Sequence, residues 1–245
     1  MTTVHWGIYH DRKEKWFTLT AIEPTPALRE IIKARDVTNQ AHFTKCPAFI
    51  EYYKNTYVIK SPVDIKFTYD HATKRLNIFP QLQGFFDANI AYRGHLVGEH
   101  DDFLMSFSIN YLFIADKDCT MELLPCLMHK SEFVDKTRLI VGTFNINKWY
   151  RPVEVAFEFK NSTTTINVKR GDALAYVKFL SKDGRKINLQ HRDFSEDTLN
   201  VVKTCVAVKD SDNKFSLAAL YKLSERIRNK LWFNKSKCPF NWRNK

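Results

Sequence analysis

The sequence predicts a mainly β fold: an antiparallel sandwich, jelly roll or barrel with one N-terminal helix and C-terminal helices. Two observations carry this prediction. Between residues 56 and 180, roughly eight to ten short segments rich in β-branched and aromatic residues follow one another without helical spacing between them. The composition, with 44% hydrophobic residues, 19 Phe and 10 Tyr, supplies enough bulk for a core, so a disordered chain is not expected.

The first elements are a helix and a hairpin. Over 24–34, Leu28, Ile31 and Ile32 recur at helical spacing after an early proline, which predicts a short amphipathic helix. Alternating segments at 56–61, 64–70 and 74–80 predict strands. The polar residues 71–73 between the last two predict a hairpin turn, and Pro62 separates the first two.

The central part of the chain continues as strands. Segments with the same composition are found at 103–116, 120–128, 138–146, 153–159, 164–170 and 173–180. Gly171 and Asp172 interrupt the pattern before the last of them, which predicts a tight turn between two consecutive strands.

The periodicity becomes helical after residue 189. Ser195 and the acidic residues after it are typical of a helix N-terminus over 195–204. A second helix is predicted over 215–233, with Leu217 and Leu220 in an apolar stripe. Because neither an internal repeat nor a flexible linker is present, the sequence predicts one domain over 1–245. It comprises a β core at about 20–190 and a basic helical extension over 195–245.

Several classes of protein are excluded by composition. No run approaches the roughly 20 apolar residues that a membrane helix needs, and the first residues lack the apolar stretch of a secretory signal. Five cysteines without a C-x-x-C pair argue against a disulfide framework and a structural zinc site. We therefore expect a protein of the cytoplasm with reduced thiols.

The positive charge is concentrated near the C-terminus. Of a net charge of +11, residues 201–245 contribute eleven Lys or Arg against three Asp or Glu, which leaves 27 against 24 in the first 200 residues. Clustered cations gain free energy when they release counterions from a polyanion, and aromatic side chains can stack on bases. The predicted nucleic-acid-binding residues are Lys222, Arg226, Arg228, Lys230, Lys235, Lys237, Trp242 and Arg243. The alternative is a solvated helix face whose aromatic residues anchor the extension to the core.

Three blocks of sequence carry a resemblance to a family. They are KCPAFIEYYKNTYVIKSPVDIKF (45–67), INKWYRPVEVAFEF (146–159) and INVKRGDALAYVKF (166–179). In this order they resemble uncharacterised proteins of tailed phages and aquatic bacteria, over roughly residues 20–180. The resemblance implies a viral origin and a cupin-like core, which is a double-stranded β-helix. It implies no reaction, because that family has no assigned activity.

A metal site is the alternative that a cupin-like core suggests. Fe(II) oxygenases of this architecture, which use 2-oxoglutarate, bind iron through a His-x-Asp triplet and a distant His. Here His100 and Asp102 form such a triplet, and His129 or His191 is a candidate third ligand. Residues 173–180 contain no His, so the ordinary cupin metal pattern is absent. Cys46, four residues after His42, is interpreted as a buried structural thiol rather than a nucleophile.

The leading functional hypothesis is a non-enzymatic phage accessory or virion-associated protein. It would act in the cytoplasm of the infected cell or in the virion, need no cofactor, and bind nucleic acid or an acidic protein through its basic extension. The alternatives are an Fe(II)- and 2-oxoglutarate-dependent oxygenase-like enzyme and a structural virion component. The last would be expected to form homo-oligomers.

Overall fold

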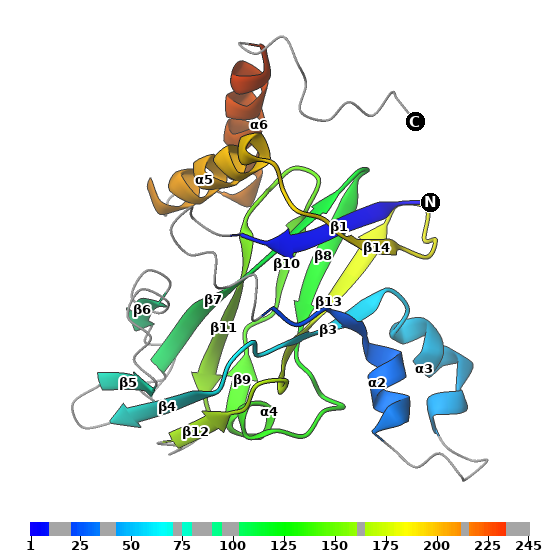
Figure 1. Cartoon of the computed structure of the whole chain (residues 1–245), viewed down its shortest axis with the longest axis vertical. Coiled ribbons are helices and arrows are strands. Elements are labelled where there is room, and N and C mark those ends of the chain that lie inside the picture. The colour runs from blue at the N-terminus through cyan, green and yellow to red at the C-terminus, as the bar shows by residue number, and fades with distance from the viewer. Residues whose placement is uncertain are drawn as a thin grey trace.

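A computed structural model describes residues 1–9, 21–34, 43–70, 75–79, 90–94, 103–160, 165–211 and 216–233. Strands account for 42% of the structure and helices for 27%, which confirms the predicted mainly β class. The strands form three sheets, and helices lie at two ends of the molecule (Figure 1).

The first sheet is organised around the long strand β7. Its order is β14 (Asn188–His191), β1 (Thr3–Ile8), β7 (Phe103–Ala115), β11 (Pro152–Phe159) and β9 (Thr137–Leu139), and β6 (Ile90–Gly94) also pairs with β7. Asn110 has a φ of 58°, a left-handed conformation that Asn tolerates better than most residues. Strand β7 pairs with β6 before Asn110 and with β1 after it, so this residue lies where the partner strand changes.

The other two sheets complete the β core. The second has the order β10 (Gly142–Asn145), β8 (Cys119–Leu124), β13 (Ala173–Ser181), β3 (Thr56–Lys60) and β2 (Thr25–Pro26). The third has the order β12 (Thr165–Val168), β4 (Ile65–Asp70) and β5 (Arg75–Phe79). The pairing of β4 with β5 confirms the predicted hairpin, whose turn lies outside the described residues.

A bent antiparallel ribbon joins the second and third sheets. Strands β3 and β13 pair up to Lys60 and Ala173, and β4 and β12 continue the pairing from Ile65 and Val168. At the bend, the Ser61 amide donates to the Asp172 carbonyl and the Gly171 amide donates to the Ser61 carbonyl, both at 2.9 Å. Gly171 has a φ of 94°, which a side chain would strain. The predicted turn at Gly171 and Asp172 therefore carries the chain from one sheet to another.

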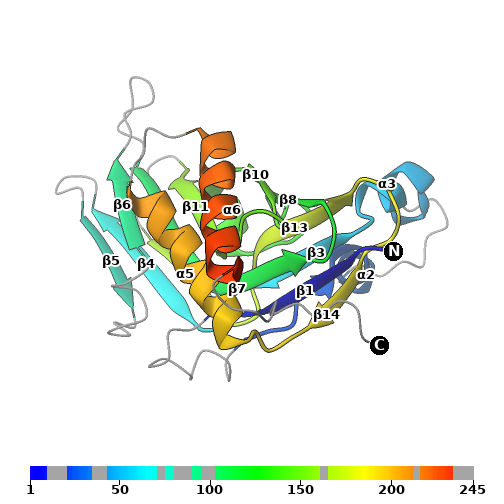
Figure 2. The ribbon, with the colours of Figure 1, turned by 90° about the horizontal axis from the view of Figure 1, so that it is seen from above.

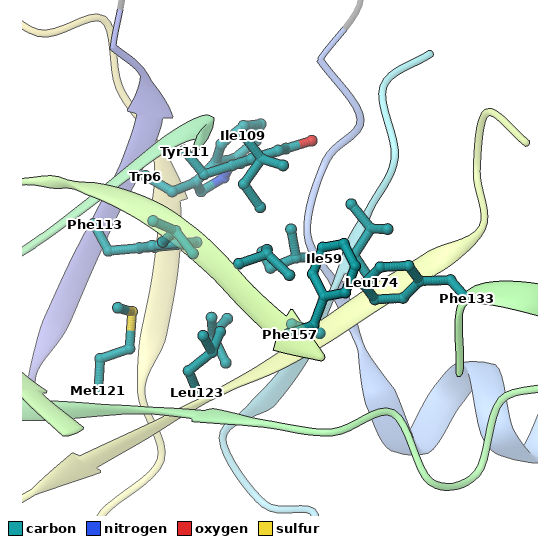
Figure 3. Close-up of a cluster of buried hydrophobic side chains, with 14 of the residues drawn as sticks. Trp6, Ile59, Ile109, Tyr111, Phe113, Met121, Leu123, Phe133, Phe157 and Leu174 are labelled. Atoms are coloured by element: carbon teal, nitrogen blue, oxygen red, sulfur yellow. The ribbon is translucent and has the colours of Figure 1, made fainter. Parts of the chain in front are cut away.

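Aromatic and aliphatic side chains from all three sheets meet in one core. Figure 3 shows part of this core, with residues of the first two sheets and Phe133 of α4 labelled. Alternate residues of β7 point in opposite directions: Tyr111 and Phe113 enter this core, whereas Leu112 and Ile114 face the other side of the sheet. Phe157 of β11 packs against Phe67 of the third sheet, with ring centroids 5.9 Å apart.

Helices cover outer surfaces of the sheets. At one end, α2 (Ala27–Lys33), the 3-10 helix η1 (Phe43–Lys45) and α3 (Pro47–Tyr52) lie beside the second sheet, and α4 (Glu132–Lys136) leads into β9. At the other end, α5 (Glu196–Ser211) packs on the first sheet, and α6 (Leu217–Phe233) packs beside α5 (Figure 2). The helices predicted at 24–34, 195–204 and 215–233 are confirmed.

Some sequence predictions were wrong or incomplete. The segment 138–146 is not one strand, because the chain leaves β9 after Leu139 and enters β10, in another sheet, at Gly142. The strand predicted over 120–128 ends at Leu124, before Pro125. Sequence analysis did not predict β1, β14, α3 or α4. The Cys-Pro step precedes a helix, with Pro47 at its first position, and Cys46 is exposed rather than buried.

Candidate functional site

Helix α5 attaches the C-terminal helices to the β core. Its buried residues Val201, Val202 and Cys205 pack against Leu112 and Ile114 of β7. Because these β7 residues face away from the main core, they give the first sheet a second apolar face. Burying that face stabilises the position of α5.

Helix α6 is held to α5 and to the second sheet by one of its sides. The hydroxyl of Ser224, which is 1% exposed, lies 2.9 Å from Cys205 Sγ. The hydroxyl of Tyr221 accepts a 2.9 Å hydrogen bond from the Asn145 amide at the end of β10. The Tyr221 ring is also 5.8 Å from that of Trp149, which is 2% exposed. These contacts fix the direction in which the remaining side chains of α6 point.

The opposite side of α6 presents cations to the solvent. Lys222 and Arg226 are exposed and are four residues apart, so they lie one above the other on the same face. Glu225 is exposed beside them and offsets part of their charge. An Arg can bind a phosphate through two parallel N–H donors, and a Lys through a single compact charge.

The other predicted nucleic-acid-binding residues are described less fully. Arg228 and Lys230 belong to α6, but their side chains are outside the described part of the structure. Lys235, Lys237, Trp242 and Arg243 lie beyond the described residues. The structure therefore brings together Lys222 and Arg226 and leaves the rest of this set as a prediction.

Of the proposed iron ligands, His129 and His191 are described; His100 and Asp102 lie outside the described residues. His191 is exposed at the end of β14, and its ring lies 4.7 Å from that of Trp6 in an edge-to-face arrangement. It borders a groove of about 540 Å³ that Arg192 also lines. Within the described ranges, no three His, Cys, Asp or Glu residues are grouped as metal ligands.

A polar network that sequence analysis missed lies on the second sheet, under α2. His129, in the loop after β8, places Nδ1 2.8 Å from the Tyr176 hydroxyl and Nε2 3.5 Å from Glu30 Oε2. Glu30 Oε1 also accepts hydrogen bonds from Lys60 and Thr25. The network joins α2, β2, β3, β13 and the loop after β8.

Burial and charge shift the pKa values of this network in different directions. Burial lowers the pKa of His129 below its usual value, against the opposing effect of Glu30. For Glu30, burial alone would raise the pKa, but hydrogen bonds from Lys60 and Thr25 and the Lys60 charge lower it overall. Burial raises the pKa of Tyr176, so its hydroxyl stays protonated. The described residues thus form a carboxylate, a neutral imidazole and a phenol in a chain of polar contacts.

Sequence reasoning could not detect the network because its members are far apart along the chain. Glu30 and His129 are brought together only when α2 packs on the second sheet. The signal that was present is the charged Glu30 between the apolar residues Leu28 and Ile31 of a predicted amphipathic helix. An acidic residue near a buried helix face requires a partner, but the sequence does not say which.

No model of a known protein family matches this chain, and a comparison with curated proteins found no match. Among the described residues, no helix combines the length and the apolar character required to cross a membrane.

Proposed function

We propose that this protein is a non-enzymatic binding protein whose basic C-terminal helix contacts nucleic acid. The observation that carries the proposal is the division of α6 into two sides. Tyr221 and Ser224 hold one side to the protein, while Lys222 and Arg226 extend from the other. Cations held on a fixed helix can follow a phosphate backbone with less loss of side-chain and backbone freedom than cations on an unstructured segment.

The sequence that follows supports the same proposal. After α6, residues 234–245 add Lys235, Lys237 and Arg243 together with Trp242. Cations and aromatic side chains in alternation suit single-stranded nucleic acid, because they contact the phosphates and the base faces. The positive charge of the described helix therefore continues along the chain.

The proposal includes a jelly-roll or cupin-like core and a role in phage infection, in the virion or in the cytoplasm of the infected cell. The bent ribbon of β3–β4 and β12–β13 supports the jelly roll, since a jelly roll is an antiparallel ribbon folded across two sheets. The phage role rests on the resemblance of residues 45–67, 146–159 and 166–179. An acidic protein is the alternative partner for the same cations.

The test is fluorescence anisotropy with single-stranded and duplex oligonucleotides over a salt series. The variant Lys222→Glu/Arg226→Glu should weaken binding about tenfold or more at a fixed salt concentration. It should also make the slope of log K against log salt concentration shallower by about two, because two fewer cations release counterions. The control is Lys66→Glu/Lys186→Glu, which makes the same change in net charge at exposed positions outside α6. The control should bind nearly as well as the wild type.

Two outcomes would contradict the proposal. If the wild type binds neither DNA nor RNA at low salt, α6 does not contact nucleic acid. If both charge-reversal variants lose the same affinity, binding depends on net charge and not on α6. An acidic protein as the partner would then be tested with acidic peptides in the same assay.

A further inference from the structure

A pocket of about 160 Å³ opens where the first and second sheets separate. Strand β9 pairs with the end of β11, and the chain then crosses at Ile140 and Val141 to β10 in the second sheet. This crossing leaves a space between β8 and β10 on one side and β11 on the other. The pocket is a different place from the proposed nucleic-acid contact, because its lining includes neither Lys222 nor Arg226, although Trp149 in its wall packs against Tyr221 of α6.

The inner wall of the pocket is apolar and well ordered by packing. Met121, Leu123, Ile146 and Val153 line it, and each is at most 4% exposed. The rim is also apolar, since Val141 is 60% exposed beside it. A wall of this kind binds an apolar group by removing it from water.

Three residues place polar groups in this apolar wall: Arg151, Glu154 and Trp149. Arg151 lines the pocket, where its Nη2 lies 2.6 Å from Glu154 Oε2 and its guanidinium carbon lies 5.8 Å from the centroid of the Phe144 ring. These contacts fix the guanidinium group but use only part of its five N–H donors. Trp149 also lines the pocket, and its buried indole N–H has no hydrogen-bond partner in the described structure. An unpaired buried donor is uncommon, and an acceptor group supplied by a ligand would satisfy it.

The volume decides which ligands the pocket can hold. Sites for metabolites and cofactors usually measure about 300–1,000 Å³, so the pocket is too small to enclose a nucleotide or a larger cofactor. A cavity of about 150 Å³ lined by Leu, Ile and Phe is known to accept benzene. The pocket therefore matches one six-membered ring.

We propose that this pocket binds a single-ring aromatic compound carrying one hydrogen-bond acceptor group. The ring would occupy the space between Leu123 and Val153, and the acceptor would pair with the free donors of Arg151 or with the Trp149 indole N–H. The Arg151–Glu154 ion pair remains in place, so the entrance carries no net charge and the acceptor can be neutral or anionic.

The test uses benzamide, benzoate and toluene as probes, with titration calorimetry and the indole N–H signal of Trp149 in proton–nitrogen correlation spectra. The indole signal is assigned with the variant Trp149→Phe. We expect saturable binding of benzamide or benzoate, a shift of the Trp149 signal, and at least fivefold weaker binding of toluene. Which of the two polar probes binds more tightly distinguishes a neutral from an anionic acceptor.

Three variants locate the binding and test its polar contact. Ala156→Leu places a larger side chain against the pocket and should weaken binding of the polar probes at least tenfold, whereas Ala218→Leu, at an exposed position of α6, should not. Arg151→Met should reduce the preference for the polar probes over toluene while the ring still binds. The proposal is wrong if none of the probes binds at millimolar concentration, or if Ala156→Leu folds and binds as tightly as the wild type. Equal affinity for toluene and both polar probes would show that the ligand needs no hydrogen-bond acceptor group, which contradicts that part of the proposal.

Discussion

At the scale of single residues, His129 shows how burial sets a protonation state. Its two ring nitrogens face different groups: a phenol at Nδ1 and a carboxylate at Nε2. Glu30 favours the charged imidazole, but burial outweighs it and lowers the pKa below 6.5, the usual value. Lys60 donates a hydrogen bond to Glu30, and its positive charge repels a charged imidazole, which also lowers the pKa of His129. The neutral form of His129 therefore belongs to the folded state.

This assignment predicts that stability decreases as the pH falls below about 6.5. With a lowered pKa in the folded state, the unfolded chain binds a proton more readily, so stability is fully present above the unfolded pKa and decreases between the two pKa values. The free energy of urea unfolding, measured at pH 7.5 and pH 5.5, should decrease in the wild type. The decrease should be smaller in His129→Gln.

Other groups limit how much of the pH effect the variant removes. Burial, followed by repulsion from Arg192, lowers the pKa of His5. His5 therefore also lowers the free energy of unfolding as the pH falls, and this contribution remains in His129→Gln. The lowered pKa of Glu30 reduces the free energy of unfolding only at a lower pH, near 4.5, the usual pKa of Glu. Parallel pH curves for the wild type and His129→Gln would show that His129 is not held neutral by the fold.

At the scale of elements, β1 and β14 show how a close backbone approach requires one particular residue. The two strands pair in parallel from Thr3 and Asn188 to Trp6 and His191. Next to this ladder, a Cβ atom at Gly7 would lie 2.4 Å from the Arg192 carbonyl oxygen and 2.8 Å from the Phe194 ring. The Arg192 amide also donates to the Trp6 carbonyl at 2.8 Å, so this backbone cannot move away freely.

We expect Gly7→Ala to lower the free energy of unfolding by about 1–3 kcal/mol, because it overpacks a site bounded by backbone. Gly142→Ala is a matched control: the added Cβ would lie 3.3 Å from the Phe144 ring, a side chain that can shift. Gly142→Ala should lower the free energy of unfolding by less than Gly7→Ala does. Both values can be measured by urea denaturation. An equal effect of the two substitutions would mean that β14 adjusts easily.

At the scale of the whole molecule, Phe157 links elements that are distant in sequence. It is fully buried on β11, where its ring lies 5.9 Å from Phe67 of the third sheet and 4.9 Å from Phe133 of α4. It is also 5.8 Å from Phe159 on the same strand. Removing this ring would leave a cavity bordered by several elements.

We expect Phe157→Ala to lower the free energy of unfolding by about 3–5 kcal/mol, through lost apolar burial and the remaining cavity. Leu180→Ala, at a position that is 41% exposed, should cost less than about 1.5 kcal/mol. Urea denaturation of both variants provides the comparison. A loss below about 2 kcal/mol for Phe157→Ala would show that the core collapses around the missing ring.

The sequence by itself determined the local character of most elements. Alternation over 64–70 and helical spacing over 24–34 and 215–233 are local signals, because side chains two residues apart in a strand, or three and four apart in a helix, share a face. The mainly β class follows from the number of such strands. The concentration of charge after residue 200 is likewise a property of the sequence alone.

The tertiary structure alone decided which segments meet. It divided 138–146 between two sheets, because β9 pairs with β11 in the first sheet and β10 pairs with β8 in the second. It also placed His129 beside Glu30 and Tyr176, exposed Cys46, and oriented Lys222 away from the helix side that holds Tyr221. These outcomes depend on contacts between residues far apart in the chain, and such contacts leave no periodic signal in the sequence.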